Sequence, residues 1–174
     1  MAEQFPALNA EHQTFIEQQH MFFVATAPTD GGRVNVSPKG YDAFRILDDH
    51  TVCYLDLTGS GAETIAHVRD NGRITFMFCA FEGKPNICRL YGTARVVRAG
   101  DAGFDDAAGV RSIIVADIDR TSNSCGFSVP FMDFVEDRPT LARHWEGKDD
   151  EELADYWAKK NETSIDGLPA VDQR

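Results

Sequence analysis

The sequence predicts a mainly β protein, built around a closed antiparallel sheet with a few flanking helices. Short β-prone runs begin near residue 21 and follow one another through short turns, which gives about six or seven strands. Only one internal segment, shortly after residue 60, has a convincing helical pattern, whereas a doubly wound sheet needs helices between successive strands. A small β-barrel therefore explains the pattern better.

Length and composition indicate one domain over residues 1–174, because 174 residues with 43% hydrophobic content can bury a substantial core. The net charge of -11 disfavours nucleic acid and anionic membrane surfaces as partners. The four cysteines form no C-x-x-C pair, which fits a reducing compartment. With no basic leader and no apolar run of about 20 residues, we expect a soluble cytoplasmic protein.

The expected elements can be placed in chain order. Asn9 caps a helix over residues 9–19, and a barrel occupies about residues 20–130. Gly92 marks a bend of the kind that barrel strands make at corners. The expected strands cover residues 21–27, 33–37, 43–47, 51–57, 73–81, 86–98 and 111–119.

The C-terminal region, about residues 137–165, has a helical pattern instead. Pro139 suits the first turn of one helix. Asp149 and Glu152 form a capping box for a second helix, whose apolar stripe contains Trp157. We therefore expect helices that flank the barrel.

The segment after the strand at 51–57 reads T-G-S-G-A-E-T and leads into the internal helix. Gly59 and Gly61 leave backbone amides uncovered, and Thr58, Ser60 and Thr64 add hydroxyls where a helix N-terminus attracts phosphate. The segment thus predicts a cradle for a phosphorylated cofactor. An ordinary strand-to-helix turn capped by Ser60 is equally consistent with this segment, and both interpretations stay open.

Three further features carry possible chemistry. The segment R-V-N-V-S-P-K-G delivers Lys39 at a turn, where it either faces an anion or is solvated. Arg89 interrupts an apolar strand, so it reaches a ligand, a carboxylate or solvent. The segment 121–132 is too polar for a core strand and too aromatic for a plain loop, and we expect Cys125 there to be packed and inert.

Other catalytic signatures are missing from the sequence. The five histidines show no paired metal-ligand spacing, and neither a G-x-S-x-G elbow nor a G-K-[ST] loop occurs. The third glycine of a dinucleotide fingerprint is also missing. No metal is expected, and no side chain can be named as catalytic.

Five segments in order resemble the pyridoxamine phosphate oxidase-like family of FMN-binding split barrels. They are M-F-F-V-A-T-A, R-V-N-V-S-P-K-G, V-C-Y-L-D-L-T-G-S-G-A-E-T, R-I-T-F-M-F and R-L-Y-G-T-A-R-V-V. The resemblance runs from about residue 20 to residue 130. It implies a six-stranded antiparallel split barrel that forms a homodimer, with FMN bound in clefts between the subunits.

The resemblance also assigns site residues. Those along the flavin ring and ribityl chain would be Val36, Ser37, Lys39, Asp56, Leu57 and Thr58. Those at the phosphate end would be Ser60, Gly61, Glu63 and Thr64, with Arg89 approaching the same ligand or the partner subunit. A small planar substrate would enter beside Tyr41, Phe127 and Phe131.

The implied function is an FMN-dependent oxidoreductase that moves electrons between a reduced donor, such as a reduced nicotinamide, and this substrate. The match departs from the classical oxidase at Glu63, an acid where basic side chains are expected, and in its helical C-terminal tail. A B6 vitamer is therefore not the expected substrate. Alternatives are the same barrel with deazaflavin or haem, and a noncatalytic flavin-binding or sensing module.

Overall fold

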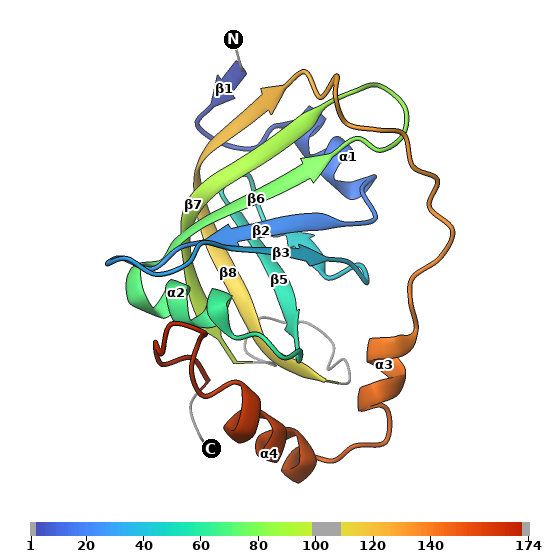
Figure 1. Ribbon diagram of the computed structural model, residues 1–174. Coiled ribbons are helices and arrows are strands. Elements are labelled where there is room, and N and C mark those ends of the chain that lie inside the picture. The colour runs from blue at the N-terminus through green and yellow to red at the C-terminus, as the bar shows by residue number, and fades with distance from the viewer. Residues whose placement is uncertain (1–2, 99–108, 172–174) are drawn as a thin grey trace.

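The computed structural model describes residues 3–98 and 109–171, and its centre is one curled antiparallel sheet (Figure 1). The strand order is β3-β2-β6-β7-β8-β5-β4, and β1 pairs with β8. The strands are β1 (Glu3–Phe5), β2 (Phe22–Thr26), β3 (Asn35–Lys39), β4 (Phe44–Ile46), β5 (Thr51–Leu57), β6 (Arg73–Cys79), β7 (Ile87–Val97) and β8 (Val110–Ser124). A mainly β fold with an antiparallel curled sheet and a few helices confirms the predicted class.

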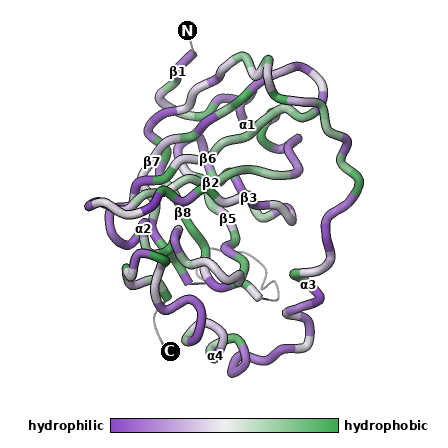
Figure 2. Tube along the Cα trace, viewed as in Figure 1, coloured by the Kyte–Doolittle hydropathy of each residue, from purple (hydrophilic) through white to green (hydrophobic). Residues whose placement is uncertain are grey.

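The core lies inside the curl, because alternate residues of each strand point there. In β6, Ile74, Phe76 and Phe78 are buried, while the residues between them are half-buried. Phe76 and Phe78 form an aromatic cluster with Phe22. The ring centroids of Phe22 and Phe78 lie 5.6 Å apart. Figure 2 shows the corresponding hydrophobic stretch along β8.

The predicted bend at Gly92 is confirmed as an irregularity between Tyr91 and Gly92 in the pairing of β7 with β8. A Cβ atom at position 92 would lie 2.1 Å from the carbonyl oxygen of Asp117. Since real side chains never approach backbone that closely, only glycine lets the two strands meet here.

Two strand predictions need correction. β8 continues past residue 119 to Ser124, so residues 121–124 are strand although they look too polar. They extend because their backbone pairs with both β7 and β1, a pairing that side-chain polarity does not reveal. The short β1 was not predicted, since three residues carry no readable alternation.

The first hairpin is also shifted relative to the prediction. β3 covers Asn35–Lys39 rather than 33–37, so Lys39 pairs with Phe22 within the ladder instead of following the strand. The sheet tolerates Pro38 because β3 is an edge strand. The alternation of β3 then places Ser37 and Lys39 on the same face as Asn35.

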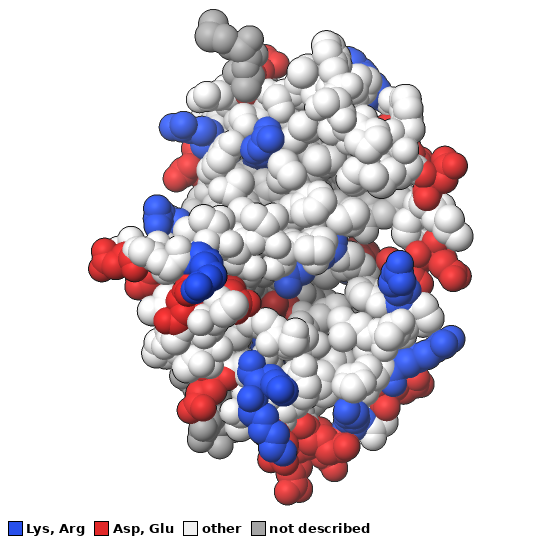
Figure 3. Space-filling model, viewed as in Figure 1, with Lys and Arg blue, Asp and Glu red and all other residues white. Residues whose placement is uncertain are grey.

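Within residues 3–98 and 109–171, four helices flank the sheet: α1 (Ala10–Glu17), α2 (Glu63–Asn71), α3 (Thr140–Trp145) and α4 (Asp150–Lys160). Asn9 caps α1, and Asp149 with Glu152 forms the predicted capping box of α4. Figure 3 shows acidic side chains gathered over α4, whose first turn is acidic. In the described parts of the chain, no helix is long and apolar enough to cross a membrane.

The cysteines divide into three buried thiols and one exposed thiol. Burial raises the pKa of Cys53 to about 11 and that of Cys88 to about 12, and it also raises the pKa of Cys79. Cys125 is exposed, so the expectation of a packed Cys125 is wrong. It lies outside the core, at the start of the long segment between β8 and α3 (Thr140–Trp145).

Only Cys125 is therefore expected to react quickly with a disulfide reagent such as dithionitrobenzoate at pH 8, because the thiolate is the nucleophile and buried thiols stay protonated. Absorbance of the released thiol should report one fast equivalent per chain. Cys125→Ser should abolish that phase, and Cys53→Ser should leave it intact. Fast reaction at a second site would contradict the burial.

Candidate functional site

The candidate site lies where β5 ends and α2 begins, around residues 58–62, which we call the glycine turn. The curl of the sheet brings edge strand β3 to this point (Figure 1). Lys39 on β3 reaches Asp56 on β5, with 3.5 Å between Nζ and Oδ1. The structure thus joins two of the segments from which site residues were predicted.

Asp56 is the centre of a buried charge cluster. Its Oδ2 accepts hydrogen bonds from Arg111 Nε at 2.9 Å and from Ser112 Oγ at 3.4 Å, and Arg111 Nη2 lies 2.8 Å away. The side chains of Asp56 and Arg111 are 1% and 4% exposed. Arg111 Nη1 also donates to the carbonyl of Gly61 at 2.9 Å. With Lys39 included, the cluster carries one net positive charge.

Arg111 was not among the predicted site residues. The signal for it was present, because Arg111 opens the apolar run R-S-I-I-V just as Arg89 interrupts another apolar strand. A charge in such a run is rarely buried without a partner. What the sequence does not show is that Asp56 is that partner.

A polar network links two predicted residues, Ser37 and Thr64, through Asn35. Ser37 Oγ donates to Asn35 Oδ1 at 3.0 Å, and Asn35 Nδ2 donates to Thr64 Oγ1 at 3.1 Å. Thr26 Oγ1 then lies 3.0 Å from Nδ1 of the buried His67. Since β3 and α2 are tied together here, the positions of Ser37 and Thr64 depend on each other.

The C-terminal segment covers the other side of the glycine turn. Trp145 Nε1 donates to the carbonyl of Thr58, and Trp157 Nε1 donates to Thr58 Oγ1, both at 3.0 Å. Asn161 Nδ2 donates to the carbonyl of Gly59 at 3.0 Å. Ile165 N donates to Glu63 Oε1 at 3.2 Å. The four donors, Trp145, Trp157, Asn161 and Ile165, were not predicted for the site, whereas Thr58 and Glu63 were.

The carbonyl acceptors of the glycine turn are thus engaged, and Thr58 N donates to the Gly109 carbonyl at 2.8 Å, whereas the backbone donors after Thr58 are not engaged. Within residues 3–98 and 109–171, the backbone N–H groups from Gly59 to Ala62 have no hydrogen-bond acceptor. Ala62 is the N-cap of α2 and offers no side-chain cap, so the alternative in which Ser60 caps the helix is wrong. The free amides fit the predicted anion cradle.

An apolar hollow lies next to the glycine turn, because one of its lining residues, Trp145, donates to the Thr58 carbonyl. It measures about 180 Å³ and is lined by Tyr41, Ala43, Leu55, Leu57, Leu141, Ala142 and Trp145. Two predicted residues, Tyr41 and Leu57, therefore share a surface against which a flat ring system can lie. Tyr41 has φ 63° and Asp42 φ 49°, a left-handed conformation that is uncommon for residues with side chains.

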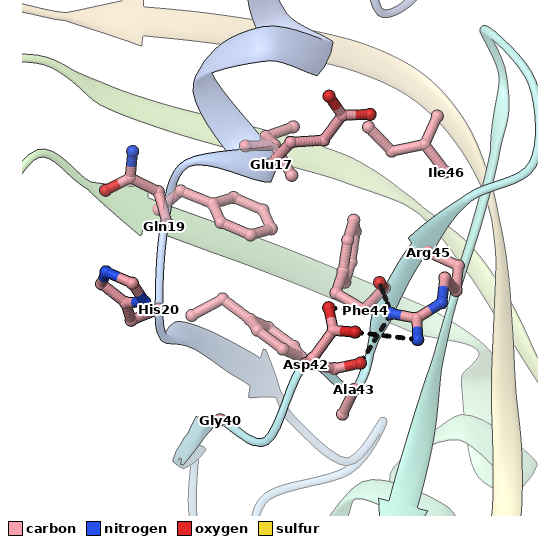
Figure 4. A pocket seen from close by; sticks show the side chains of 12 residues that line it. Glu17, Gln19, His20, Gly40, Asp42, Ala43, Phe44, Arg45 and Ile46 are labelled. Atoms are coloured by element: carbon pink, nitrogen blue, oxygen red, sulfur yellow. Dashed lines mark hydrogen bonds and ion pairs between the residues drawn. The ribbon is translucent and has the colours of Figure 1, made fainter. Parts of the chain in front are cut away.

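A second, larger cavity of about 470 Å³ lies between α1 and the sheet, and Gly40 is among its lining residues (Figure 4). Phe22, Phe44 and Phe78 form its apolar wall. Arg45 turns onto Asp42 at the rim, with 3.0 Å between Nη1 and Oδ1, and Glu17 lies on the α1 side.

Four predicted residues lie apart from this site in the single chain. Phe127 and Phe131 are 82% and 83% exposed and do not line the hollow beside Tyr41. Arg89 donates to Ser124 Oγ at 3.1 Å and lines a separate groove. Val36, on the exposed face of β3, is 60% exposed. Their roles toward a cofactor or partner stay predictions.

The chain matches known proteins in sequence and in fold. Residues 8–124 match the family model described as pyridoxamine 5'-phosphate oxidase. The pyridoxamine 5'-phosphate oxidase family protein ustO of Aspergillus flavus is 39% identical over 178 residues, which cover 88% of this chain and 72% of that protein.

Two solved structures share the fold with a TM-score of 0.54. HupZ of Group A Streptococcus is 23% identical, with 72% of this chain and 99% of that chain covered. A Lactobacillus delbrueckii protein, whose description assigns it provisionally to pyridoxamine 5'-phosphate oxidase, is 18% identical, with 69% and 97% covered. From the sequence matches, the chain belongs to the pyridoxamine 5'-phosphate oxidase family.

Proposed function

We propose that this protein binds a flavin, FMN in the first instance, between Lys39, the glycine turn and the apolar hollow of Tyr41 and Leu57. The observation that carries the proposal is the net positive cluster of Lys39, Arg111 and Asp56 beside free backbone amides, in a chain of net charge -11. Membership of the pyridoxamine 5'-phosphate oxidase family supports it.

The residues fit the ring end of a flavin. The hollow beside Leu57 offers an apolar face, and Lys39 offers a cation that favours the anionic reduced ring. The bound flavin would supply the redox chemistry, moving electrons from a reduced donor to a small planar substrate. The chain's own residues hold and orient it, and the three buried cysteines suit a cytoplasmic enzyme.

A homodimer is part of this proposal. The exposed large apolar side chains include Val34, Val36, Phe127, Phe131 and Val135. Exposed apolar surface of this kind is typical of protein interfaces, and a second subunit would supply the missing wall of the site. Size-exclusion chromatography with light scattering should give about twice the chain mass of 19.3 kDa. A monomer at micromolar concentration would argue against the dimer.

The first test of the function is a visible absorption spectrum of purified protein, with and without added FMN. Flavin bands that bleach on anaerobic addition of a reduced nicotinamide are expected. A Soret band would indicate haem instead, and deazaflavin has its own absorption. Bound flavin that no donor reduces would favour a noncatalytic module.

Lys39→Ala is expected to weaken FMN binding about tenfold or more, because a hydrogen bond from a charged group contributes about 1.5–3 kcal/mol. Quenching of flavin fluorescence measures the dissociation constant. Lys84→Ala removes the same charge from an exposed turn and should leave the affinity unchanged. If the Lys39→Ala variant binds FMN with the same affinity as the wild-type protein, Lys39 is not part of the site.

A further inference from the structure

The end of the site that would receive a flavin's terminal phosphate contains a carboxylate of the protein itself. We propose that Glu63 is a specificity-determining residue that cancels the attraction of the glycine turn for a phosphate dianion. The ligand class that follows is a flavin with an uncharged side-chain end, such as riboflavin, bound about as tightly as FMN. This inference rests on the proposed flavin binding and deepens it.

The first step is the position of the Glu63 carboxylate. A Cβ atom at Gly61 would lie 2.6 Å from Glu63 Oε2, so this oxygen lies directly against the turn. The other oxygen accepts the hydrogen bond from Ile165 N at 3.2 Å. The C-terminal segment therefore holds the carboxylate over the turn instead of leaving it free in solvent.

The second step concerns the electrostatic field at the N-terminus of α2. Glu63 is the first residue of α2, where a negative charge is favoured by the helix dipole and by free N–H groups. An incoming phosphate would be attracted by these same groups. The carboxylate of Glu63 already places a negative charge in this region, although it accepts no hydrogen bond from the N–H groups of residues 59–62, and it repels a second anion.

The third step is the state of the nearby cations. Arg111 is engaged by Asp56 and by the carbonyl of Gly61, and Lys39 contacts Asp56. The charges of Lys39 and Arg111 balance those of Asp56 and Glu63, so the four groups sum to zero. A phosphate dianion would gain hydrogen bonds from amides here, but no net charge attraction.

The test compares riboflavin with FMN on the full chain, using the fluorescence of each flavin to measure its dissociation constant. For the wild-type protein, the two constants should agree within about threefold. Glu63→Gln keeps the shape of the side chain and removes its charge. It should tighten FMN binding about tenfold, which corresponds to about 1.4 kcal/mol, and leave riboflavin binding unchanged.

Glu11→Gln is the matched control, because it removes one negative charge from an exposed position on α1 and should change neither constant. A wild-type preference for FMN over riboflavin of more than about threefold would overturn the inference while the proposed function stands. FMN affinity of Glu63→Gln equal to wild type would also overturn it. If neither flavin binds, the proposed function fails and the inference fails with it. The wild-type comparison needs no variant, so a misfolded Glu63→Gln leaves the test decisive.

Discussion

Replacing Arg111 with methionine is expected to lower the free energy of unfolding by about 3–5 kcal/mol, because one partner of a buried ion pair is removed and the other charge stays buried. Among the residues that the structure describes, Asp56 would retain Lys39, at 3.5 Å, and the hydroxyl of Ser112 as its partners. The carbonyl of Gly61 would also lose its donor. Urea unfolding followed by circular dichroism measures the loss.

Arg95→Met is the matched control for this experiment. Arg95 pairs with Asp117 on the surface, where the two side chains are 57% and 65% exposed, and such pairs contribute about 0–1 kcal/mol. The double variant Arg111→Met with Asp56→Asn should recover part of the loss, since no unpaired buried charge remains. If Arg111→Met loses no more than Arg95→Met, Asp56 is stabilised by something other than Arg111.

The features that were predicted correctly depend on signals from residues that are neighbours in the sequence. Short β-prone runs identified β5 and β6, glycine identified the irregularity at position 92, and Asp149 with Glu152 identified the start of α4. Each of these signals is confined to a few adjacent positions. Physical rules for strands, bulges and caps act over the same short range, which explains why they could be applied to the sequence.

The features that were missed depend on contacts between distant positions. Asp56 and Arg111 are 55 positions apart, and Thr58 and Trp157 are 99 apart. Nothing near Arg111 indicates which carboxylate the curl of the sheet will bring to it. The helical tail was predicted, but the face of the barrel that it covers was not, because its apolar stripe is compatible with any apolar surface.

The second large expected effect on stability concerns Trp157, in the C-terminal tail. Trp157 is 6% exposed, so Trp157→Ala is expected to lower the free energy of unfolding by about 3–5 kcal/mol through the cavity it creates. Trp157→Phe keeps most of the ring but removes the donor to Thr58 Oγ1, and should cost about 1 kcal/mol. Urea unfolding should rank the two variants in that order.

A double-mutant cycle can isolate the hydrogen bond from the packing. Thr58→Val removes the hydroxyl, so it should show a coupling of about 1 kcal/mol with Trp157→Phe. The matched cycle with Trp145→Phe should show much less coupling, because Trp145 donates to the backbone carbonyl of Thr58, which valine retains. Equal coupling in both cycles would mean that the tail acts on the turn through packing alone. Coupling confined to Trp157 would mean that the tail fixes the Thr58 side chain and thereby the orientation of the turn's free amides.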